Sequence, residues 1–380
     1  MDPVPLATGP GAPIAEARYS RQALLPGFDA AGQARLAASR VLVIGAGGLG
    51  SVTATYLAAA GVGTLGIVDD DLVEVSNLHR QVIHGERDLG RAKVDSAADR
   101  LGQINPRVRV VRHRERLDET NARALIAAYD IVVDGADNFA TRYVVADACV
   151  LESTPLVWGS ILRFDGQATV WWPPAGPCYR CVFPSPPPAG SVLGCAEAGV
   201  LGSMCATIGA ACSTEALKLI AGVGRPLIGR LLVHNALDQS YGEIPLRPNP
   251  RCALCGSEAM VTTPGEGILA ACAPPEPVGE RLSPSDLQAL LTHDDLVLVD
   301  VREPDEWASG MIAGARGIPL GTLATAGLPD GDVVLYCAGG VRSAEGVRIL
   351  RKAGREARDL AGGIAAWRAE GRAAEAAPGA

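Results

Sequence analysis

The chain has 380 residues, which is long enough for two domains. Of these residues 48% are hydrophobic and 20% charged, a balance typical of a folded protein. Its net charge of −8, from 34 basic and 42 acidic residues, gives no basic field and argues against nucleic acid as a partner. No run approaches the roughly twenty apolar residues of a membrane span, and the opening Met-Asp-Pro-Val-Pro does not fit a secretion signal. We therefore expect a cytoplasmic protein without a membrane partner. Ten cysteines in that compartment predict metal ligands and reactive thiols rather than disulfides.

The first part of the chain is predicted to be a parallel α/β domain over residues 16–256, after a mobile leader over residues 1–15 that is rich in Pro, Gly and Ala. An apolar run at residues 41–44 predicts a buried strand. A glycine-rich turn and a helix over residues 49–60 lead from it to a strand at residues 64–69, which completes a βαβ unit. Further strands are predicted at residues 108–111, 131–133, 156–158 and 167–172.

The last hundred residues predict a second, smaller α/β domain. Residues 257–279 contain four prolines and are a predicted linker, so we expect this domain over residues 280–380. Its strands are predicted at residues 297–299 and 333–336, and its helices near residues 285–291, 343–353 and 363–370.

A glycine-rich fingerprint marks the predicted turn after the first strand. Its residues are Gly45, Gly47, Gly48 and Gly50, and Asp69 ends the next strand about twenty residues further on. Such glycines let the backbone approach a phosphate, the helix N-terminus stabilises the phosphate charge, and the carboxylate can accept hydrogen bonds from a ribose. The fingerprint alone does not distinguish NAD from ATP. On the glycines and Asp69 only, a Rossmann oxidoreductase that binds a dinucleotide is the default expectation.

Charged residues beyond the fingerprint fit a nucleotide triphosphate. Arg80 and Lys93 are cations suited to β- and γ-phosphates, because a pyrophosphate leaving group carries charge that must be stabilised. Asp137 suits a Mg²⁺ that is held together with substrate phosphates. Taken singly, the two cations are better explained by a solvated salt bridge, and Asp137 with Asn138 by a turn at a strand end.

These residues occur together with Arg-Tyr-Ser-Arg-Gln at residues 18–22 and Ser-Asn-Leu-His-Arg-Gln at residues 76–81. In this order the motifs resemble those of the ubiquitin-activating-like adenylyltransferases of the molybdopterin-synthase and thiazole-pathway type. The resemblance implies a Rossmann-like domain that uses ATP and Mg²⁺ to adenylate the C-terminal Gly-Gly carboxylate of a ubiquitin-fold sulfur-carrier protein. It also implies nucleotide contacts from Asn77 and Asn138. Contact of Arg21 with the ATP of a second subunit is implied as well, which would make the protein a homodimer.

Two Cys-x2-Cys pairs predict a structural zinc site. The four residues are Cys178, Cys181, Cys252 and Cys255. Four thiolates can close a tetrahedral Zn²⁺ site, and a site without an open position is expected to stabilise the fold. The pairs lie about seventy residues apart, so the fold must bring them together, which the resemblance implies. Two redox dithiols or four buried thiols are the alternative.

A further cysteine, Cys195, follows a proline-rich loop predicted over residues 173–194 and matches the position of the reactive cysteine in the resembled family. Its neighbours are mostly apolar residues and glycine, so the local sequence alone favours an inert buried thiol, and only the resemblance favours a reactive one.

The second domain resembles a single rhodanese, or sulfurtransferase, domain. The matching motifs lie at residues 298–303, 306–307, 310–319 and 337–342. Cys337 ends a predicted strand and opens a loop with two glycines, whose N–H groups can stabilise an anionic persulfide, and Arg342 adds a cation to the same loop. Met311 and Ala338 depart from residues common in rhodaneses. A domain retained only for binding is the alternative.

The combined hypothesis is an adenylyltransferase fused to a sulfurtransferase. A Cys337 persulfide, loaded by a donor such as a cysteine desulfurase, would attack the carrier's acyl-adenylate. Cys195 would then form a thioester or reduce an acyl-disulfide to release a thiocarboxylate. A Rossmann oxidoreductase with a sulfur-binding module and a non-catalytic ATP-binding scaffold for a ubiquitin-fold partner are the other two hypotheses. The sequence leaves open whether the sulfur ends in molybdopterin, thiamine, cysteine, thiolated tRNA or a secondary metabolite.

Overall fold

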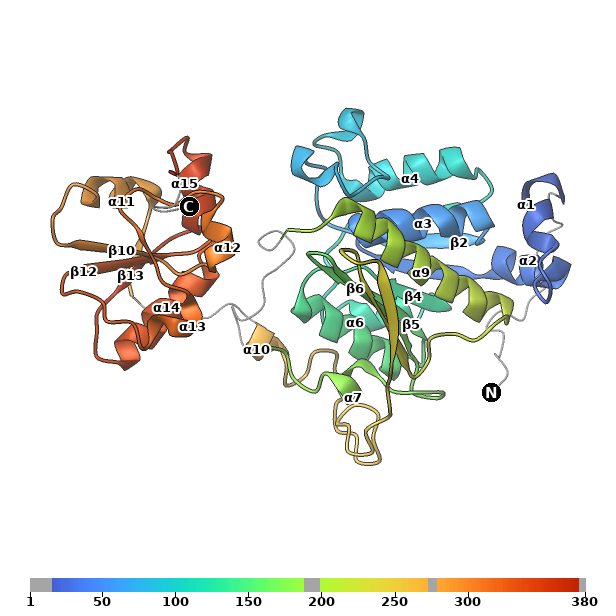
Figure 1. Ribbon diagram of the computed structural model, residues 1–380. Helices are drawn as coiled ribbons and strands as arrows, with labels where there is room; N and C mark the ends of the chain where they lie inside the picture. Colours follow the sequence, from blue (N-terminus) through green and yellow to red (C-terminus); the bar gives the residue numbers. More distant parts are fainter. Residues whose placement is uncertain (1–15, 188–198, 273–278, 376–380) are drawn as a thin grey trace. The chain divides into compact units, whose positions relative to one another are not determined.

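The computed structural model describes residues 16–187, 199–272 and 279–375 (Figure 1). The chain divides into two compact units, and each is described by itself. The first unit holds the described residues up to Pro186 and from residue 199 to Leu269, and the second holds Pro187 and the described residues from Ala270 onward. The predicted leader over residues 1–15 and Cys195 lie outside the described residues.

The first unit is built on one eight-stranded sheet with the order β3-β2-β1-β4-β5-β6-β7-β8. The strands are β1 (Arg40–Ile44), β2 (Thr64–Val68), β3 (Arg109–His113), β4 (Ile131–Asp134), β5 (Leu156–Leu162), β6 (Asp165–Trp171), β7 (Arg230–Asn235) and β8 (Ser240–Pro245). Strands β3 to β5 pair in parallel and β5 to β8 pair antiparallel. The predicted Rossmann-like α/β class is confirmed. The order reverses between β1 and β4, which is where open α/β sheets bind ligands.

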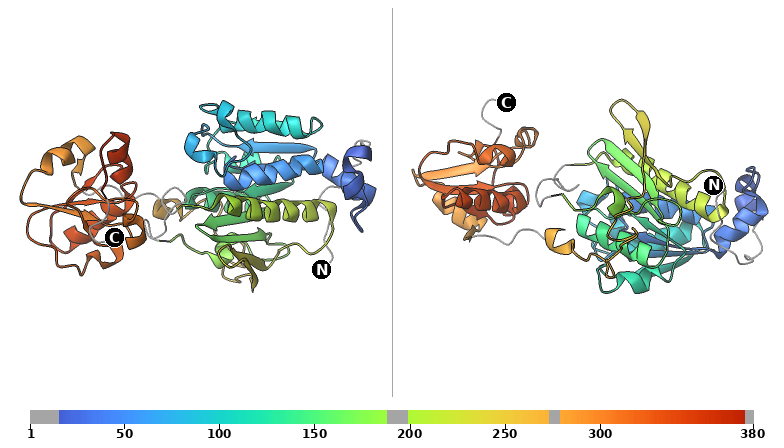
Figure 2. Two further views of the ribbon diagram at one scale, coloured as in Figure 1. Left: turned by 45° about the horizontal axis from the view of Figure 1, so that its top comes forward. Right: turned by 90° about the horizontal axis from the view of Figure 1, so that it is seen from below.

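Helices cover both faces of this sheet (Figures 1 and 2). They are α1 (Glu16–Ala23), α2 (Asp29–Ala38), α3 (Gly48–Ala60), α4 (Lys93–Ile104), α5 (Ala122–Ile126), α6 (Phe139–Leu151), α7 (Tyr179–Val182) and α9 (Gly202–Ala221), with 3₁₀ turns η1 (Val75–Asn77) and η2 (Glu86–Asp88). Helix α7 lies inside the segment that the sequence predicted to be a loop. Helices α3 and α9 lie side by side, because Gly209 has no side chain where a Cβ would meet Val52 at 2.8 Å.

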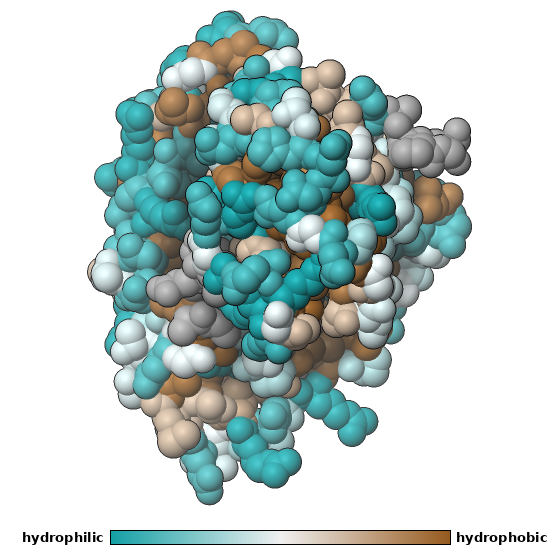
Figure 3. Space-filling model, turned by 90° about the vertical axis from the view of Figure 1, so that its left-hand side faces the viewer, coloured by the Kyte–Doolittle hydropathy of each residue, from teal (hydrophilic) through white to brown (hydrophobic). Residues whose placement is uncertain are grey.

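Helix α9 is long and apolar enough to cross a membrane by length and composition. However, 61% of its apolar window is buried inside the protein, and the helix packs against α3 and strands β5 and β6. These contacts assign it to the core of the first unit. The surface in Figure 3 is mostly hydrophilic, with hydrophobic residues scattered over it.

The second unit has a five-stranded parallel sheet with the order β11-β10-β12-β13-β9. Its strands are β9 (Arg281–Leu282), β10 (Leu296–Asp300), β11 (Arg316–Gly317), β12 (Asp332–Tyr336) and β13 (Arg358–Leu360). Its helices are α11 (Pro284–Leu290), α12 (Pro304–Trp307), α13 (Leu320–Leu323), α14 (Val341–Lys352) and α15 (Gly363–Ala369), and the short α10 (Leu269–Cys272) precedes them.

Both faces of this second sheet are buried, as the continuous apolar sequence of β12 requires. Val334 and Tyr336 pack in one core cluster, whereas Val333 and Leu335 pack in the other. Cys337, the residue after β12, lies in the same core cluster as Val333 and Leu335. Its thiol is therefore part of a packed layer.

The predicted linker over residues 257–279 needs a correction, because its first part is attached to the first unit. The N–H of Gly265 donates to Oδ2 of Asp147 at 2.7 Å, and Nη2 of Arg180 donates to the carbonyl of Glu266 at 3.0 Å. Arg180 and Asp147 are buried and pair with each other at 2.6 Å. The composition of the segment could not reveal these partners, since both lie more than eighty residues away in sequence.

Replacement of Arg180 tests this attachment. We expect Arg180→Met to lower the free energy of unfolding of the first unit by about 3–5 kcal/mol, because Asp147 would be left as a buried carboxylate without its cation. Proteolysis between residues 262 and 272 should become faster. The matched control is Arg123→Met, which breaks the more exposed Arg123–Glu152 pair and should change stability by at most about 1 kcal/mol. Equal effects in urea unfolding followed by tryptophan fluorescence would contradict the account.

Candidate functional site

A cleft opens at the carboxyl ends of β1, β2 and β4. It consists of two adjoining cavities, and the residues that line both are Gly45, Asp69, Asp71, Ala136 and Asp137. Gly47, Gly48, Arg80 and Lys93 line the first cavity, and Asn138 lines the second. The fold thus brings the glycine loop, the predicted phosphate-binding cations and the predicted Mg²⁺ ligand to one place, at the reversal of the strand order.

The glycine loop is shaped by close backbone contacts. Gly45 has a φ of +83°, in the left-handed region that favours glycine. A Cβ on Gly50 would lie 1.8 Å from the Gly45 carbonyl oxygen, and one on Gly48 would lie 2.5 Å from Sγ of Cys205. Helix α3 begins at Gly48, so its first N–H groups are at the cleft, where they can bind a phosphate.

Asp69, which was predicted to contact the ribose, also accepts hydrogen bonds from the backbone. Its Oδ2 accepts the N–H of Ala46 at 2.8 Å and its Oδ1 accepts the N–H of Asp71 at 2.9 Å. Burial raises the pKa of Asp69, and the nearby ammonium of Lys93 counteracts part of that rise. The carboxylate therefore holds the glycine loop, while its remaining lone pairs face the cleft that it lines.

The two cations of the cleft differ in their surroundings. Lys93 is buried, and its Nζ lies 2.7 Å from Oδ2 of the more exposed Asp71. Nη1 of Arg80 donates to the carbonyl of Ser76 at 2.8 Å. Lys93 thus takes part in a salt bridge, as the alternative interpretation expected, and it also lines the first cavity together with Arg80.

Three further residues were predicted to contact the nucleotide: Asn138, Asn77 and Arg21. Oδ1 of Asn138 accepts the N–H of Thr141 at 2.9 Å, so this residue caps α6 as well as lining the second cavity. Asn77 is buried in η1, where its Oδ1 accepts the N–H of Glu74 at 3.3 Å. Asn77 and the exposed Arg21 of α1 are not among the residues that line the two cavities. Their nucleotide contacts stay predictions.

Gln81 and Arg142 are among the lining residues that were not predicted to bind the nucleotide. Gln81 is buried and lines the first cavity, and it ends the motif at residues 76–81, which is the signal that could have identified it. Arg142 lines the same cavity, and its Nε donates to the carbonyl of Ala136 at 3.1 Å. It follows Asn138 by one helical turn, so the helix position next to the loop was the available signal.

Asp134 is a buried carboxylate at the end of β4, directly before the loop that carries Asp137. Its Oδ1 accepts the N–H of Ala136 at 2.8 Å. Burial raises the pKa of Asp134 to about 6, although the guanidinium of Arg142 acts in the opposite direction.

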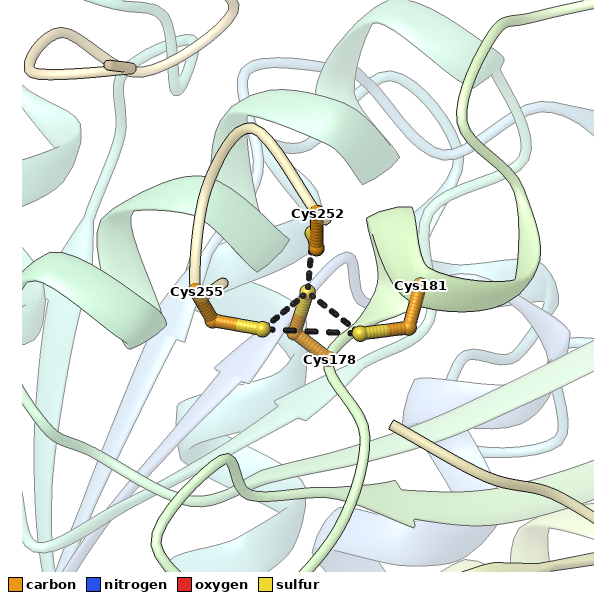
Figure 4. A group of neighbouring side chains, drawn as sticks. All are labelled: Cys178, Cys181, Cys252 and Cys255. Atoms are coloured by element: carbon orange, nitrogen blue, oxygen red, sulfur yellow. Dashed lines mark hydrogen bonds between the residues drawn. The ribbon is translucent and has the colours of Figure 1, made fainter. Parts of the chain in front are cut away.

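The four cysteines of the predicted zinc site lie together, as Figure 4 shows. Their Sγ atoms are 3.3–3.7 Å apart along the four contacts drawn. A tetrahedron with Zn–S bonds of about 2.3 Å has sulfur atoms about 3.8 Å apart, so the donor set fits Zn²⁺ closely. A hydrogen bond with Cys178 lowers the pKa of Cys255 to about 5 and raises that of Cys178, because neighbouring thiols do not all ionise without a cation.

In the second unit, the described contacts of Cys337 differ from the predicted ring of N–H groups. The thiol is fully buried, and its Sγ accepts one backbone N–H, that of Gly340, at 3.1 Å. The hydroxyl of Ser343 lies 3.7 Å from the sulfur and donates to Oδ2 of Asp359 at 3.2 Å. Arg342, which was predicted to add a cation to this loop, is paired with Glu306, and its role toward a persulfide stays a prediction.

That pair is bidentate, with Nη1 and Nη2 of Arg342 at 2.6 and 2.8 Å from the two carboxylate oxygens. Arg281 also contacts the Cys337 loop. Its Nη2 donates to the carbonyl of Gly340 at 3.2 Å and to Asp359 at 2.8 Å. Gly340 has a φ of +91°, which permits the turn between Cys337 and α14.

Comparison with known proteins decides the family. Residues 19–254 match the ThiF family, and residues 283–370 match the rhodanese-like domain. The chain belongs to the ThiF family. It is 49% identical over 362 residues to a probable adenylyltransferase/sulfurtransferase, MoeZ, of Mycobacterium tuberculosis, with 92% of each chain covered.

Two further matches each cover about two thirds of this chain. A sulfur carrier protein adenylyltransferase of Thermus thermophilus is 50% identical over 246 residues, which cover 63% of this chain and 91% of that protein. The crystal structure of E. coli MccB with MccA-N7isoASN has a TM-score of 0.58 and 22% identity, and the match covers 66% of this chain and 77% of that one. The second likeness is one of fold.

The chain is accordingly an adenylyltransferase and sulfurtransferase, and the ThiF match sets aside the oxidoreductase that the glycines alone favoured. In the ThiF domain the donor set fits zinc, whereas Cys195, the predicted second reactive thiol, lies outside the described residues.

The raised pKa of Asp134 predicts a pH-dependent stability of the ThiF domain. A carboxyl whose folded-state pKa is about 6 favours folding in its protonated form, and that contribution is lost as the pH rises through 6. Asp134→Asn should remove this loss. Relative to the parent protein, we expect the variant to gain roughly 1.5 kcal/mol more at about pH 8 than at about pH 5 in urea unfolding. A difference that does not vary with pH would contradict the assignment.

Zinc analysis tests the cysteine cluster. We expect one zinc ion per chain by elemental mass spectrometry, lost in Cys252→Ser together with a lower melting temperature of the ThiF domain. The lost metal-binding free energy is on the order of 10 kcal/mol. Cys272→Ser is the control, because Cys272 lies outside the cluster and should leave the zinc content unchanged. A metal-free protein with four reactive thiols would contradict the zinc site.

Proposed function

We propose that the chain adenylates the C-terminal Gly-Gly carboxylate of a ubiquitin-fold sulfur-carrier protein and converts it to a thiocarboxylate with sulfur carried on Cys337. The main observation in support is that one chain contains a ThiF cleft with Arg80, Lys93 and Asp137 and a rhodanese-like domain with a thiol at the end of a strand. The full-length match to a relative named for both activities supports the combination.

In the first half of the reaction, a carboxylate oxygen of the carrier attacks the α-phosphorus of the substrate ATP. The bond to pyrophosphate breaks, and the carrier is left as an acyl-adenylate. Arg80 and Lys93 stabilise the charge of the leaving pyrophosphate, and Asp137 would hold the Mg²⁺ that accompanies the phosphates. The N–H groups at the start of α3 bind phosphate oxygens.

In the second half, the terminal sulfur of a Cys337 persulfide attacks the acyl carbon. The bond to AMP breaks, and an acyl-disulfide joins the carrier to Cys337. A thiolate then attacks the Cys337 sulfur, so the carrier leaves as a thiocarboxylate and a protein disulfide forms. We assign that thiolate to Cys195. The disulfide is reduced by a cellular thiol before the next turnover. In the alternative, Cys195 displaces AMP to form a thioester, and the Cys337 persulfide then expels the Cys195 thiolate to give the same acyl-disulfide.

Two partners complete the proposal. A protein persulfide, such as that of a cysteine desulfurase, supplies the sulfane sulfur to Cys337. A second copy of the chain would bring its Arg21 to the nucleotide, in keeping with the exposure of this residue on α1 and its absence from the lining of its own cleft.

ATP–pyrophosphate exchange tests the adenylation step, with and without a ubiquitin-fold protein that ends in Gly-Gly. We expect exchange to depend on the carrier and to fall at least about a hundredfold in Asp137→Ala, because the metal and phosphate charges lose their carboxylate partner. Cys337→Ser is the control. It should retain exchange but form no thiocarboxylate.

Absence of exchange with several carriers, from protein that contains zinc and binds ATP, would contradict adenylation and favour the scaffold. Exchange that is unchanged in Asp137→Ala would contradict the role given to this residue.

A further inference from the structure

His84 is a buried histidine that contacts the glycine loop without lining the cleft. It follows η1 in the chain and lines a separate cavity beside α4. Its Nε2 lies 3.0 Å from the carbonyl oxygen of Ala46, and its Nδ1 lies 2.8 Å from Oγ of Ser96 on α4. Both partners are buried as well. The imidazole therefore connects the loop to a helix of the core.

The hydrogen bond from His84 to the carbonyl of Ala46 is significant because the N–H of Ala46 is also hydrogen-bonded. The N–H of Ala46 donates to Oδ2 of Asp69 at 2.8 Å. With its N–H and its carbonyl both engaged, Ala46 has little freedom to rotate. The peptide that follows it leads directly into Gly47 and Gly48, which line the cleft and have no side chains to fix their orientation.

The chemistry of the three groups fixes the hydrogen on the ring. A carbonyl oxygen can only accept, so Nε2 must carry the hydrogen. The hydroxyl of Ser96 can then donate to Nδ1, which leaves a neutral ring with both nitrogens satisfied. Burial lowers the pKa of His84 and outweighs the hydrogen bond to Ala46 and the charges of Asp69 and Asp88, which raise it. The charge of Lys93 acts with burial, so the neutral form is favoured.

We propose that His84 is a positioning residue of the nucleotide site, whose Nε2–H holds the Ala46 carbonyl so that the glycine loop is set for ATP before ATP arrives. The inference rests on the proposed adenylation in that it takes ATP as the ligand of this loop. A loop ordered in advance does not have to be ordered on binding, so loss of the contact weakens ATP binding. Catalysis after binding, which depends on Arg80, Lys93 and Asp137, is less affected.

Two substitutions separate the hydrogen bond from packing. His84→Leu has an apolar side chain and leaves the Ala46 carbonyl with only the longer hydrogen bond from Oγ of Ser51, at 3.4 Å. His84→Gln places an amide N–H near the position of Nε2. We expect the dissociation constant of ATP, measured by calorimetry without the carrier, to rise roughly tenfold in His84→Leu and to stay within about threefold of the parent protein in His84→Gln. The KM for ATP in pyrophosphate exchange should follow the same order, with a smaller change in kcat.

Ser96→Ala provides a second test that leaves the ring in place. Loss of the Ser96 hydroxyl frees the ring to turn or to change tautomer, so we expect roughly threefold weaker ATP binding. This variant keeps the proposal testable if His84→Leu does not fold, which zinc content and melting temperature would reveal.

Unchanged ATP binding in folded His84→Leu, or equal weakening in His84→Leu and His84→Gln, would overturn the proposal, because the hydrogen bond would then not be the cause. Unchanged binding in Ser96→Ala would contradict the fixed tautomer. These outcomes are distinct from failure of the proposed function, in which the parent protein binds ATP but shows no carrier-dependent exchange.

Discussion

Close backbone packing at the carboxyl end of β1 is the constraint on which the nucleotide cleft depends. The end of β1, the start of α3 and the end of β4 converge there, and a Cβ on Gly50 or on Gly135 would lie 1.8 or 3.0 Å from the carbonyl oxygen of Gly45 or Ile44. Only residues without side chains permit this approach. It directs the first N–H groups of α3 into the cleft and brings Asp137, which follows β4, close to the loop.

The two chemical steps take place on different units, so the length of chain between them limits the mechanism. Hydrogen bonds from residues 265 and 266 attach the chain to the ThiF domain, and Arg281 already contacts the Cys337 loop. The twelve Cα–Cα steps from Leu269 to Arg281 can span at most roughly 40 Å. Arg180, which lies between Cys178 and Cys181, fixes one end of this span through Asp147 and Glu266. A metal ion held by the four-cysteine cluster would therefore stabilise the region from which the tether begins.

Features that depend on local sequence were predicted well. Apolar runs identified β1, β2 and β4, the glycine fingerprint located the cleft, and the Cys-x2-Cys spacing identified the cluster. The β7–β8 hairpin was not predicted. The partners of charged side chains also could not be read from the sequence, because they are set by tertiary packing. Arg342 pairs with Glu306, which lies thirty-six residues away in sequence. Asp69 accepts a hydrogen bond from the backbone N–H of Ala46.

The coupling of the two units through Cys337 is the central claim. Its most direct test is a single-turnover experiment in which the Cys337 persulfide carries isotopically labelled sulfane sulfur. The protein is mixed with carrier and ATP, and the products are read by intact-mass spectrometry. The account predicts that the label appears in the carrier's C-terminal thiocarboxylate, and that acyl-adenylate accumulates in Cys337→Ser. A thiocarboxylate without label, or one formed at the same rate by Cys337→Ser, would contradict it.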